Sequence, residues 1–396
     1  MMNGTGKSDS PILPAKLANK AGRTAAEPVE GSGGTKRNVE LQRTIRTQSR
    51  EAVSRAQARI REAVTRNRQD KLTALLHHVN VEVLRASFFG LKKTAAPGVD
   101  ERTWIEYAEH LEANLLSLHV RVHTGAYRAL PSRRKYIPKA DGRQRPLGIA
   151  AIEDKIVQAA VVTVLTPIYE SEFLGFSYGF RPKRNQHQAL DALAFGIGKR
   201  RINWVLDCDV QSFFDKVDQN WLVRFVEHRI GDRRIIRLIA KWLTAGVLED
   251  GHRIETEEGT PQGAVISPLL ANIYLHHVYD QWVHQWRQRC ATGDVIVVRY
   301  ADDCVPRSHR RKKVRNCVRD GGRSSGTGRQ GQVSNHRKLR RSRAVVVSVA
   351  EKAGRDPVGM AQRDERERTV DEVSKVYRRC RNRGDVVAPG QVWGMA

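Results

Sequence analysis

The sequence lacks paired cysteines and long apolar runs. None of its five cysteines forms a CxxC pair, so neither a zinc site nor a disulfide framework is indicated, and a reducing compartment fits. The start, MMNGTGKSDS, has no apolar stretch typical of a secretory signal. The longest apolar run, 156–165, is interrupted by Gln158 and Thr163 and is too short to span a bilayer. We expect a cytoplasmic protein with no membrane association.

Acidic residues are also scarce relative to basic ones. The chain has 69 Lys and Arg against 43 Asp and Glu, which gives a net charge of +26 and a pI of about 10.3. An excess of this size favours a polyanionic partner, of which nucleic acid is the commonest. A generally basic surface without a specific partner is the alternative. The 396 residues, 40% of them hydrophobic, suffice for two or three domains.

Helical and strand patterns alternate up to residue 303, which predicts the α+β class. Residues 1–36 are poor in large apolar side chains, and we expect them to be disordered. The expected helices are 38–90, 104–123, 152–170, 221–243 and 264–286, and the expected strands are a hairpin at 134–150, then 203–209 and 295–300.

The last part of the chain, 304–396, has a different composition. It holds 24 basic and 9 acidic residues, a single leucine, and neither isoleucine nor phenylalanine. So few large apolar groups cannot offset the entropy lost on ordering. We predict disorder there, with at most a short strand at 345–349.

The most specific short motif is Val-Arg-Tyr-Ala-Asp-Asp at 298–303. A strand that ends in two consecutive carboxylates, Asp302 and Asp303, offers the oxygen ligands that Mg²⁺ prefers. The alternative is a pair of solvated turn aspartates.

A second strand ends in carboxylates within Asp-Cys-Asp-Val-Gln-Ser-Phe-Phe-Asp, 207–215. Two-metal phosphoryl transfer needs carboxylates from separate strands, and Asp209 is our choice for the ligand from this strand. Asp207 remains a competitor because it points to the same side of an extended strand. Asp215 is interpreted as structural. A third motif, Gly-Thr-Pro-Gln-Gly at 259–263, places Gln262 at a loop tip, where it could bind a nucleotide.

These segments together resemble the reverse transcriptases encoded within bacterial group II introns, which also act as maturases. The resemblance covers roughly residues 80–303. The matching blocks are AAPGVD (95–100), YIPKADGRQRPLGI (136–149), FSYGFRPKRNQHQAL (176–190), DVQSFFD (209–215), GTPQGAVISPLLANIYL (259–275) and VRYADD (298–303).

The resemblance implies a right-hand polymerase, with fingers and a partial palm, that binds intron RNA, an RNA template with a DNA primer, and dNTPs. Asp209, Asp302 and Asp303 match the three metal-binding carboxylates for Mg²⁺, and Val210 would lend a backbone carbonyl. The implied domains are a tail (1–36), a helical extension (37–94), fingers (95–200), an incomplete palm (201–303) and a basic tail (304–396).

Five further residues match the family's nucleotide-binding positions. Lys139 and Arg145 match residues that grip the triphosphate, for which an ammonium and a guanidinium are suited. Phe214 matches the aromatic side chain that excludes a ribose 2′-hydroxyl. Gln262 matches the residue that lies against the incoming nucleotide. Arg181 matches a residue near template or nucleotide, with support of the core as an equal alternative.

The sequence departs from the family after Asp303. Pro306 cannot donate to a sheet ladder, so we expect the second strand of the hairpin to be lost. No later family block is recognisable, which suggests a frameshift and predicts weak or absent polymerase activity. The alternatives are a natural basic RNA-binding tail, a non-catalytic intron-RNA-binding module and an inactive gene remnant. The oligomeric state is left open.

Overall fold

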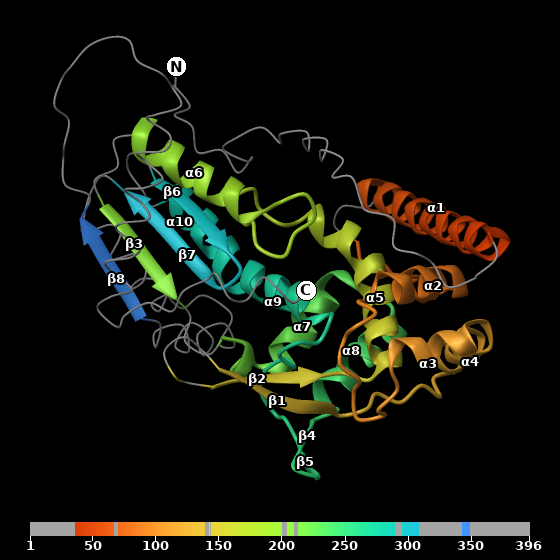
Figure 1. Ribbon diagram of the computed structural model, residues 1–396. Helices are drawn as coiled ribbons and strands as arrows, with labels where there is room; N and C mark the ends of the chain where they lie inside the picture. Colours follow the sequence, from red (N-terminus) through yellow and green to blue (C-terminus); the bar gives the residue numbers. More distant parts are fainter. Residues whose placement is uncertain are drawn as a thin grey trace. The chain divides into compact units, whose positions relative to one another are not determined.

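The computed structural model describes residues 36–66, 70–138, 142, 144–199, 204–209, 213–289, 295–308 and 343–348 (Figure 1). They fall into two compact units that interleave along the chain. The first, called here the hairpin unit, holds 173–213 and the described residues from 274 onward. The second, called the helical unit, holds the described residues up to 172 together with 214–273. The α+β class expected from the sequence is confirmed.

The helical unit is organised around α5 (Ile152–Glu170), an apolar helix buried along most of its length. It packs against α1 and α2, which also contact each other. The remaining helical segments of the unit are α1 (Lys36–Arg66), η1 (Leu76–His78), α2 (Val81–Gly90), α3 (Trp104–Glu109), α4 (Leu111–Thr124), η2 (Phe213–Asp215, whose first residue belongs to the hairpin unit), α7 (Gln219–Arg229) and α8 (Arg233–Thr244).

A four-stranded sheet completes the helical unit, in the order β2-β1-β4-β5. The hairpin of β1 and β2 is antiparallel, with Arg133 opposite Ile149, and β1 runs parallel to β4. The strands are β1 (Ser132–Pro138), β2 (Gln144–Ile149), β4 (Val247–Glu249) and β5 (His252–Ile254).

The hairpin unit is built on a second sheet, in the order β6-β7-β3-β8. Helices α6 and α10 bury opposite faces of β6, because Val295 and Val297 pack with α10 while Val298 packs with α6. Burial on both faces explains the nearly unbroken apolar run of β6. The elements are α6 (Gln186–Lys199), β3 (Trp204–Asp209), α9 (Ser267–Leu275, which crosses the unit boundary), η3 (His276–Asp280), α10 (Gln281–Arg289), β6 (Val295–Tyr300), β7 (Asp303–Ser308) and β8 (Arg343–Ser348).

Most expected elements are present, and the differences have local causes. Helix 152–170 has the expected bounds. The helix expected at 104–123 is broken at His110, and that at 221–243 is broken before Asp232, whose side chain caps α8. The strand expected at 345–349 is found as β8. The expected disorder of 1–36 and 304–396 otherwise concerns segments outside the described residues, with two exceptions. Lys36 begins α1, and residues 304–308 belong to β7, so the prediction was wrong there.

Candidate active site

Both carboxylates of the Tyr-Ala-Asp-Asp motif lie at the turn of an antiparallel hairpin. Strands β6 and β7 pair from Val295 opposite Ser308 to Tyr300 opposite Asp303. Ala301 and Asp302 form the two-residue turn, and Ala301 has a φ of 55°. Positive φ is the conformation that tight hairpin turns require, because it matches the twist of the flanking strands. The turn therefore holds Asp302 and Asp303 next to each other at one end of the sheet.

The expectation that the second strand would be lost after Asp303 was wrong. Strand β7 continues through Pro306 to Ser308, and its ladder with β6 is continuous, with Val297 opposite Pro306. The ladder with β3, by contrast, has no pair at Pro306. The gap on the β3 side covers Val305 and Pro306, and a proline without an N–H is compatible with such a gap.

Strand β3 brings the third predicted carboxylate position to the same end of the sheet. Trp204 lies opposite Ser308 and Cys208 opposite Cys304. Continued by one residue, this register places the backbone of Asp209 across from Asp303, about 5 Å away. The side chain of Asp209 is outside what the structure describes. Asp209 is the last residue of β3, and the choice between Asp209 and Asp207 stays a prediction.

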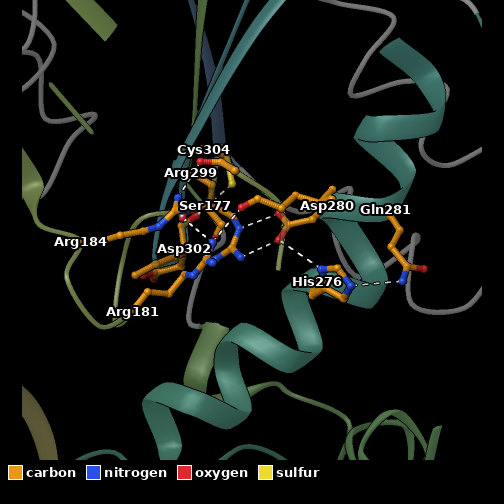
Figure 2. Close-up of polar contacts among 12 residues, drawn as sticks. Ser177, Arg181, Arg184, His276, Asp280, Gln281, Arg299, Asp302 and Cys304 are labelled. Atoms are coloured by element: carbon orange, nitrogen blue, oxygen red, sulfur yellow. Dashed lines mark hydrogen bonds and ion pairs between the residues drawn. The ribbon is translucent and has the colours of Figure 1, made fainter. Parts of the chain in front are cut away.

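A buried ion pair lies directly behind the turn (Figure 2). The fully buried Arg299 guanidinium donates from Nε to Oδ1 of Asp280 and from Nη2 to Oδ2, both at 2.7 Å. Its Nη1 donates to the Ala301 carbonyl at 2.8 Å. Burial alone lowers the pKa of Arg299, but the Asp280 carboxylate outweighs this and holds the pKa above its ordinary value.

The loop before α6 packs against the same strand. The Arg299 N–H donates to the Phe176 carbonyl at 2.9 Å, and the Tyr178 N–H donates to the Arg299 carbonyl at 2.8 Å. Gly179 lies so close to the turn that a Cβ there would overlap the backbone of Ala301. The loop therefore supports the turn from the side of β6.

Arg181, predicted to bind nucleotide or template, is a buried part of this loop. Its Nη1 donates to the carbonyls of Leu174 and Ser177 at 2.8 and 2.9 Å, and its guanidinium lies over the Phe173 ring. These contacts favour the alternative in which Arg181 supports the core.

Three predicted nucleotide-binding residues lie in the helical unit, and two of them are in contact. Nε of Arg145 on β2 donates to Oε1 of Gln262 at 3.3 Å, and Nε2 of Gln262 donates to Oδ1 of Asp215 at 2.7 Å. The Gly-Thr-Pro-Gln-Gly loop is fixed on both sides: Thr260 N–H donates to the carbonyl of Phe214 at 2.7 Å, and Gly148 N–H donates to that of Gln262 at 2.6 Å.

Lys139 and Val210 lie outside the described residues, so their roles stay predictions. The sequence reasoning missed Asp280 and Arg299, and it interpreted Asp215 as structural. Two signals pointed to the buried pair: an arginine inside the apolar strand 295–300 and an aspartate inside the helical segment 264–286. Buried charges of opposite sign are usually paired with each other. Nothing in the sequence shows that Asp215 contacts Gln262.

The carboxylates fit a divalent cation by their chemistry. Asp302 and Asp303 are hard oxygen donors, partly exposed at the turn, and Asp209 adds a third position across the ladder. Among the described residues, no preformed cluster of three or more His, Cys, Asp and Glu side chains occurs. In the part of the chain described, no helix is long and apolar enough to cross a membrane.

Comparison with known proteins identifies the class. The family model for "Reverse transcriptase (RNA-dependent DNA polymerase)" matches residues 137–323, so the match runs past Asp303, where the sequence resemblance was expected to end. Residues 137–323 are therefore similar to a reverse transcriptase domain.

Its relatives identify the branch of that class. "Protein YkfC" of Escherichia coli K12 is 41% identical over 197 residues, 49% of this chain and 51% of that protein. "Group II intron-encoded protein LtrA" of Lactococcus lactis is 42% identical over 166 residues, 42% of this chain and 27% of that protein. "Nuclear intron maturase 1, mitochondrial" of Arabidopsis thaliana is 25% identical over 28% of this chain and 15% of that protein. The matched part of the chain is thus similar to proteins encoded by group II introns and to an intron maturase. The chain spans about half or less of these relatives' lengths.

Proposed function

We propose that this chain is an RNA-directed DNA polymerase that adds deoxynucleotides to a primer 3′-end on an RNA template. The observation that carries the proposal is the sheet register at the Tyr-Ala-Asp-Asp turn. Carboxylate positions from two strands, Asp209 on one and Asp302 with Asp303 on the other, meet at one end of a sheet. Two-metal nucleotidyl transfer requires this arrangement.

In the proposal, Mg²⁺ is held by Asp209, Asp302 and Asp303 with the Val210 carbonyl. Bound there, the metal lowers the pKa of the primer 3′-hydroxyl and neutralises the charge of the leaving pyrophosphate. The protein's own part is to hold the carboxylates in fixed positions before substrate arrives, since ligands on rigid strands are placed more accurately than ligands on loops.

The nucleotide-binding residues have separate tasks in this proposal. Arg145 and Lys139 bind the triphosphate of the dNTP, a bidentate guanidinium and a point-charge ammonium being suited to phosphate oxygens. Gln262 positions the incoming nucleotide, and its amide orientation is set by Arg145 on one side and Asp215 on the other. Phe214 excludes a ribose 2′-hydroxyl and so selects deoxynucleotides.

The test is primer extension on an RNA template by the purified full chain, with dNTPs and Mg²⁺. The variants Asp302→Ala and Asp303→Ala should abolish extension, while Asp250→Ala, an exposed aspartate in the β4–β5 turn of the other unit, should not. Absence of extension by the wild-type chain across a wide Mg²⁺ range would refute the proposal. The same assay tests the expectation from the sequence that polymerase activity is weak or absent, because it measures the rate directly.

A second activity, binding of intron RNA as a maturase, is favoured by α1. Its exposed face carries Arg50, Arg55 and Arg59, while Ile60 and Val64 face the core. Arginines contacting phosphates release counterions, so the affinity should fall steeply with salt. This activity, and the cytoplasmic location where intron RNA would be met, are part of the proposal.

Replacing those three arginines by glutamine should weaken intron RNA binding and flatten its salt dependence by about one unit of slope per lost contact. The matched control is the same replacement at Arg233, Arg237 and Arg253, which are exposed outside α1. If both triple variants lose the same amount of affinity for intron RNA, only net charge matters, and a specific role for α1 is refuted. Preference for the parent intron over unrelated RNA would separate a maturase from a general RNA binder.

A further inference from the structure

The buried pair of Asp280 and Arg299 has no role in the reaction as proposed so far. We infer that both are positioning residues that fix the Ala301–Asp302 turn, so that the carboxylate of Asp302 is held ready for a divalent cation. The inference rests on the proposed function for its importance to activity. It concerns cation binding at the turn, however, and can be tested without nucleic acid.

The contacts of Arg299 leave its guanidinium little freedom. Two parallel hydrogen bonds of 2.7 Å to Asp280 fix the plane of the group, as bidentate arginine–carboxylate pairs do. The remaining Nη1 then points at the carbonyl of Ala301, the residue immediately before Asp302. Any shift of Asp280 is therefore passed through one rigid group to the turn.

The turn needs such support because its backbone is unfavourable for alanine. A left-handed conformation is unfavourable for an L-residue, and Ala301 adopts it with a φ of 55°. Without a restraint, the turn could relax and Asp302 would change direction. Arg299 restrains it from the carbonyl side, and the close packing of Gly179 restrains it from the other.

Asp280 reaches Arg299 through an irregular stretch of helix. It is the last residue of η3, a π-helical segment between α9 and α10, and the Gln281 N–H donates to the His276 carbonyl five residues back. Such segments are rare and are found most often at functional sites. The His276 ring also approaches Asp280, with Nδ1 at 3.9 Å from Oδ2 (Figure 2).

Stability alone does not account for a fully buried ion pair. Removing two charges from water costs several kcal/mol, and a well-packed apolar pair of the same volume is often equally stable. The pair instead holds the Arg299 guanidinium in a fixed orientation next to the Ala301 carbonyl of the turn. That geometry favours a positioning role over a purely structural one.

The experiment compares Asp280→Asn and Arg299→Lys with wild type and with a matched control in the other unit. The control is Glu172→Gln, which disturbs another arginine–carboxylate pair, in which Nε of the buried Arg229 lies 2.7 Å from Oε1 of the half-buried Glu172. Three quantities are measured on the full chain. The first is the Mn²⁺ affinity, obtained from the electron paramagnetic resonance signal of free Mn²⁺. The second is the Mg²⁺ concentration that gives half-maximal primer extension, and the third is the thermal unfolding midpoint.

We expect Asp280→Asn and Arg299→Lys to weaken Mn²⁺ binding. The Mg²⁺ concentration for half-maximal extension should rise by about tenfold or more, as it does when other residues that orient metal ligands are replaced. Extension should recover at saturating Mg²⁺. Glu172→Gln should lower the unfolding midpoint without changing either metal measurement. A folded Asp280→Asn with wild-type metal affinity would overturn the inference, and if that variant does not fold, Arg299→Lys decides by the same criterion.

The two proposals fail in different ways. If wild type extends no primer but binds Mn²⁺ through Asp302, shown by loss in Asp302→Ala, the polymerase proposal fails. In that case weaker Mn²⁺ binding by Asp280→Asn still supports the positioning role. If wild type shows no Mn²⁺ binding that depends on Asp302, the positioning role is refuted.

Discussion

Replacement of Asp215 by alanine is expected to weaken dNTP binding without slowing the chemical step. Asp215 accepts a hydrogen bond of 2.7 Å from Nε2 of Gln262, whose Oε1 faces Arg145 at 3.3 Å. The carboxylate therefore fixes which end of the amide faces the arginine. Without it the amide can rotate, and Arg145 also loses a fixed neighbour.

The size of the effect follows from the contact. A hydrogen bond contributes roughly 0.5–1.5 kcal/mol net, and a charged acceptor increases this, but exposure of the pair to water reduces it again. A loss of about 1 kcal/mol corresponds to a roughly fivefold higher KM for the dNTP. Asp215→Asn keeps an acceptor oxygen and should show about half of the free-energy loss.

Steady-state primer extension with a varied dNTP concentration separates the two parameters. A mutation that removes binding shared by ground and transition states raises KM and leaves kcat unchanged. A fall in kcat at constant KM in the Asp215→Ala variant would refute the assignment of Asp215 to nucleotide positioning. Unchanged thermal unfolding would exclude a general loss of structure.

Three other perturbations test separate features. Phe214→Val should permit ribonucleotide incorporation, with discrimination against rNTPs reduced about tenfold or more, and unchanged discrimination would remove Phe214 from sugar selection. Asp232→Ala leaves the N–H groups of Leu75 and Leu76 without their buried acceptor, so unfolding free energy should fall by about 3 kcal/mol in denaturant titration. Burial alone raises the pKa of Asp232, but Arg234 and these N–H groups lower it from 3.8 to about 2. The contribution of Asp232 to the unfolding free energy is therefore complete above pH 3.8 and should be lost as the pH falls towards 2. Burial raises the pKa of the Asp154 carboxyl from 3.8 to about 6. Its contribution to the unfolding free energy is therefore complete below pH 3.8 and should decline as the pH rises through 6, and Asp154→Asn should abolish this pH dependence.

Local signals in the sequence predicted the elements that carry the site. The helix expected at 152–170 is found as α5, and the hairpin expected at 134–150 is found as β1 and β2. These signals work because they involve neighbours in the chain. The break before Asp232 was missed because side-chain capping depends on which backbone N–H the carboxylate reaches, and the break at His110 has no side-chain cap that the sequence could have indicated.

The loss of β7 was predicted from one residue and was wrong for a tertiary reason. Pro306 lacks a donor in any context, but whether this matters depends on which neighbouring strand its N–H would have faced. The ladder to β6 is intact there, and the gap falls on the side of β3. Only the pairing of three strands decides that question.

The sequence by itself determined the α+β class and the six ordered motifs, and it predicted the candidate carboxylates, because these depend on residue type, period and order. Tertiary structure decided which residues meet. It brought Asp280 against Arg299 and Gln262 against Asp215, pairs separated by 19 and 47 positions. For Arg181, where the sequence left nucleotide contact and core support as equal alternatives, the contacts to the Leu174 and Ser177 carbonyls favour core support. Contacts at such separations result from how helices and strands pack, and no local pattern encodes them.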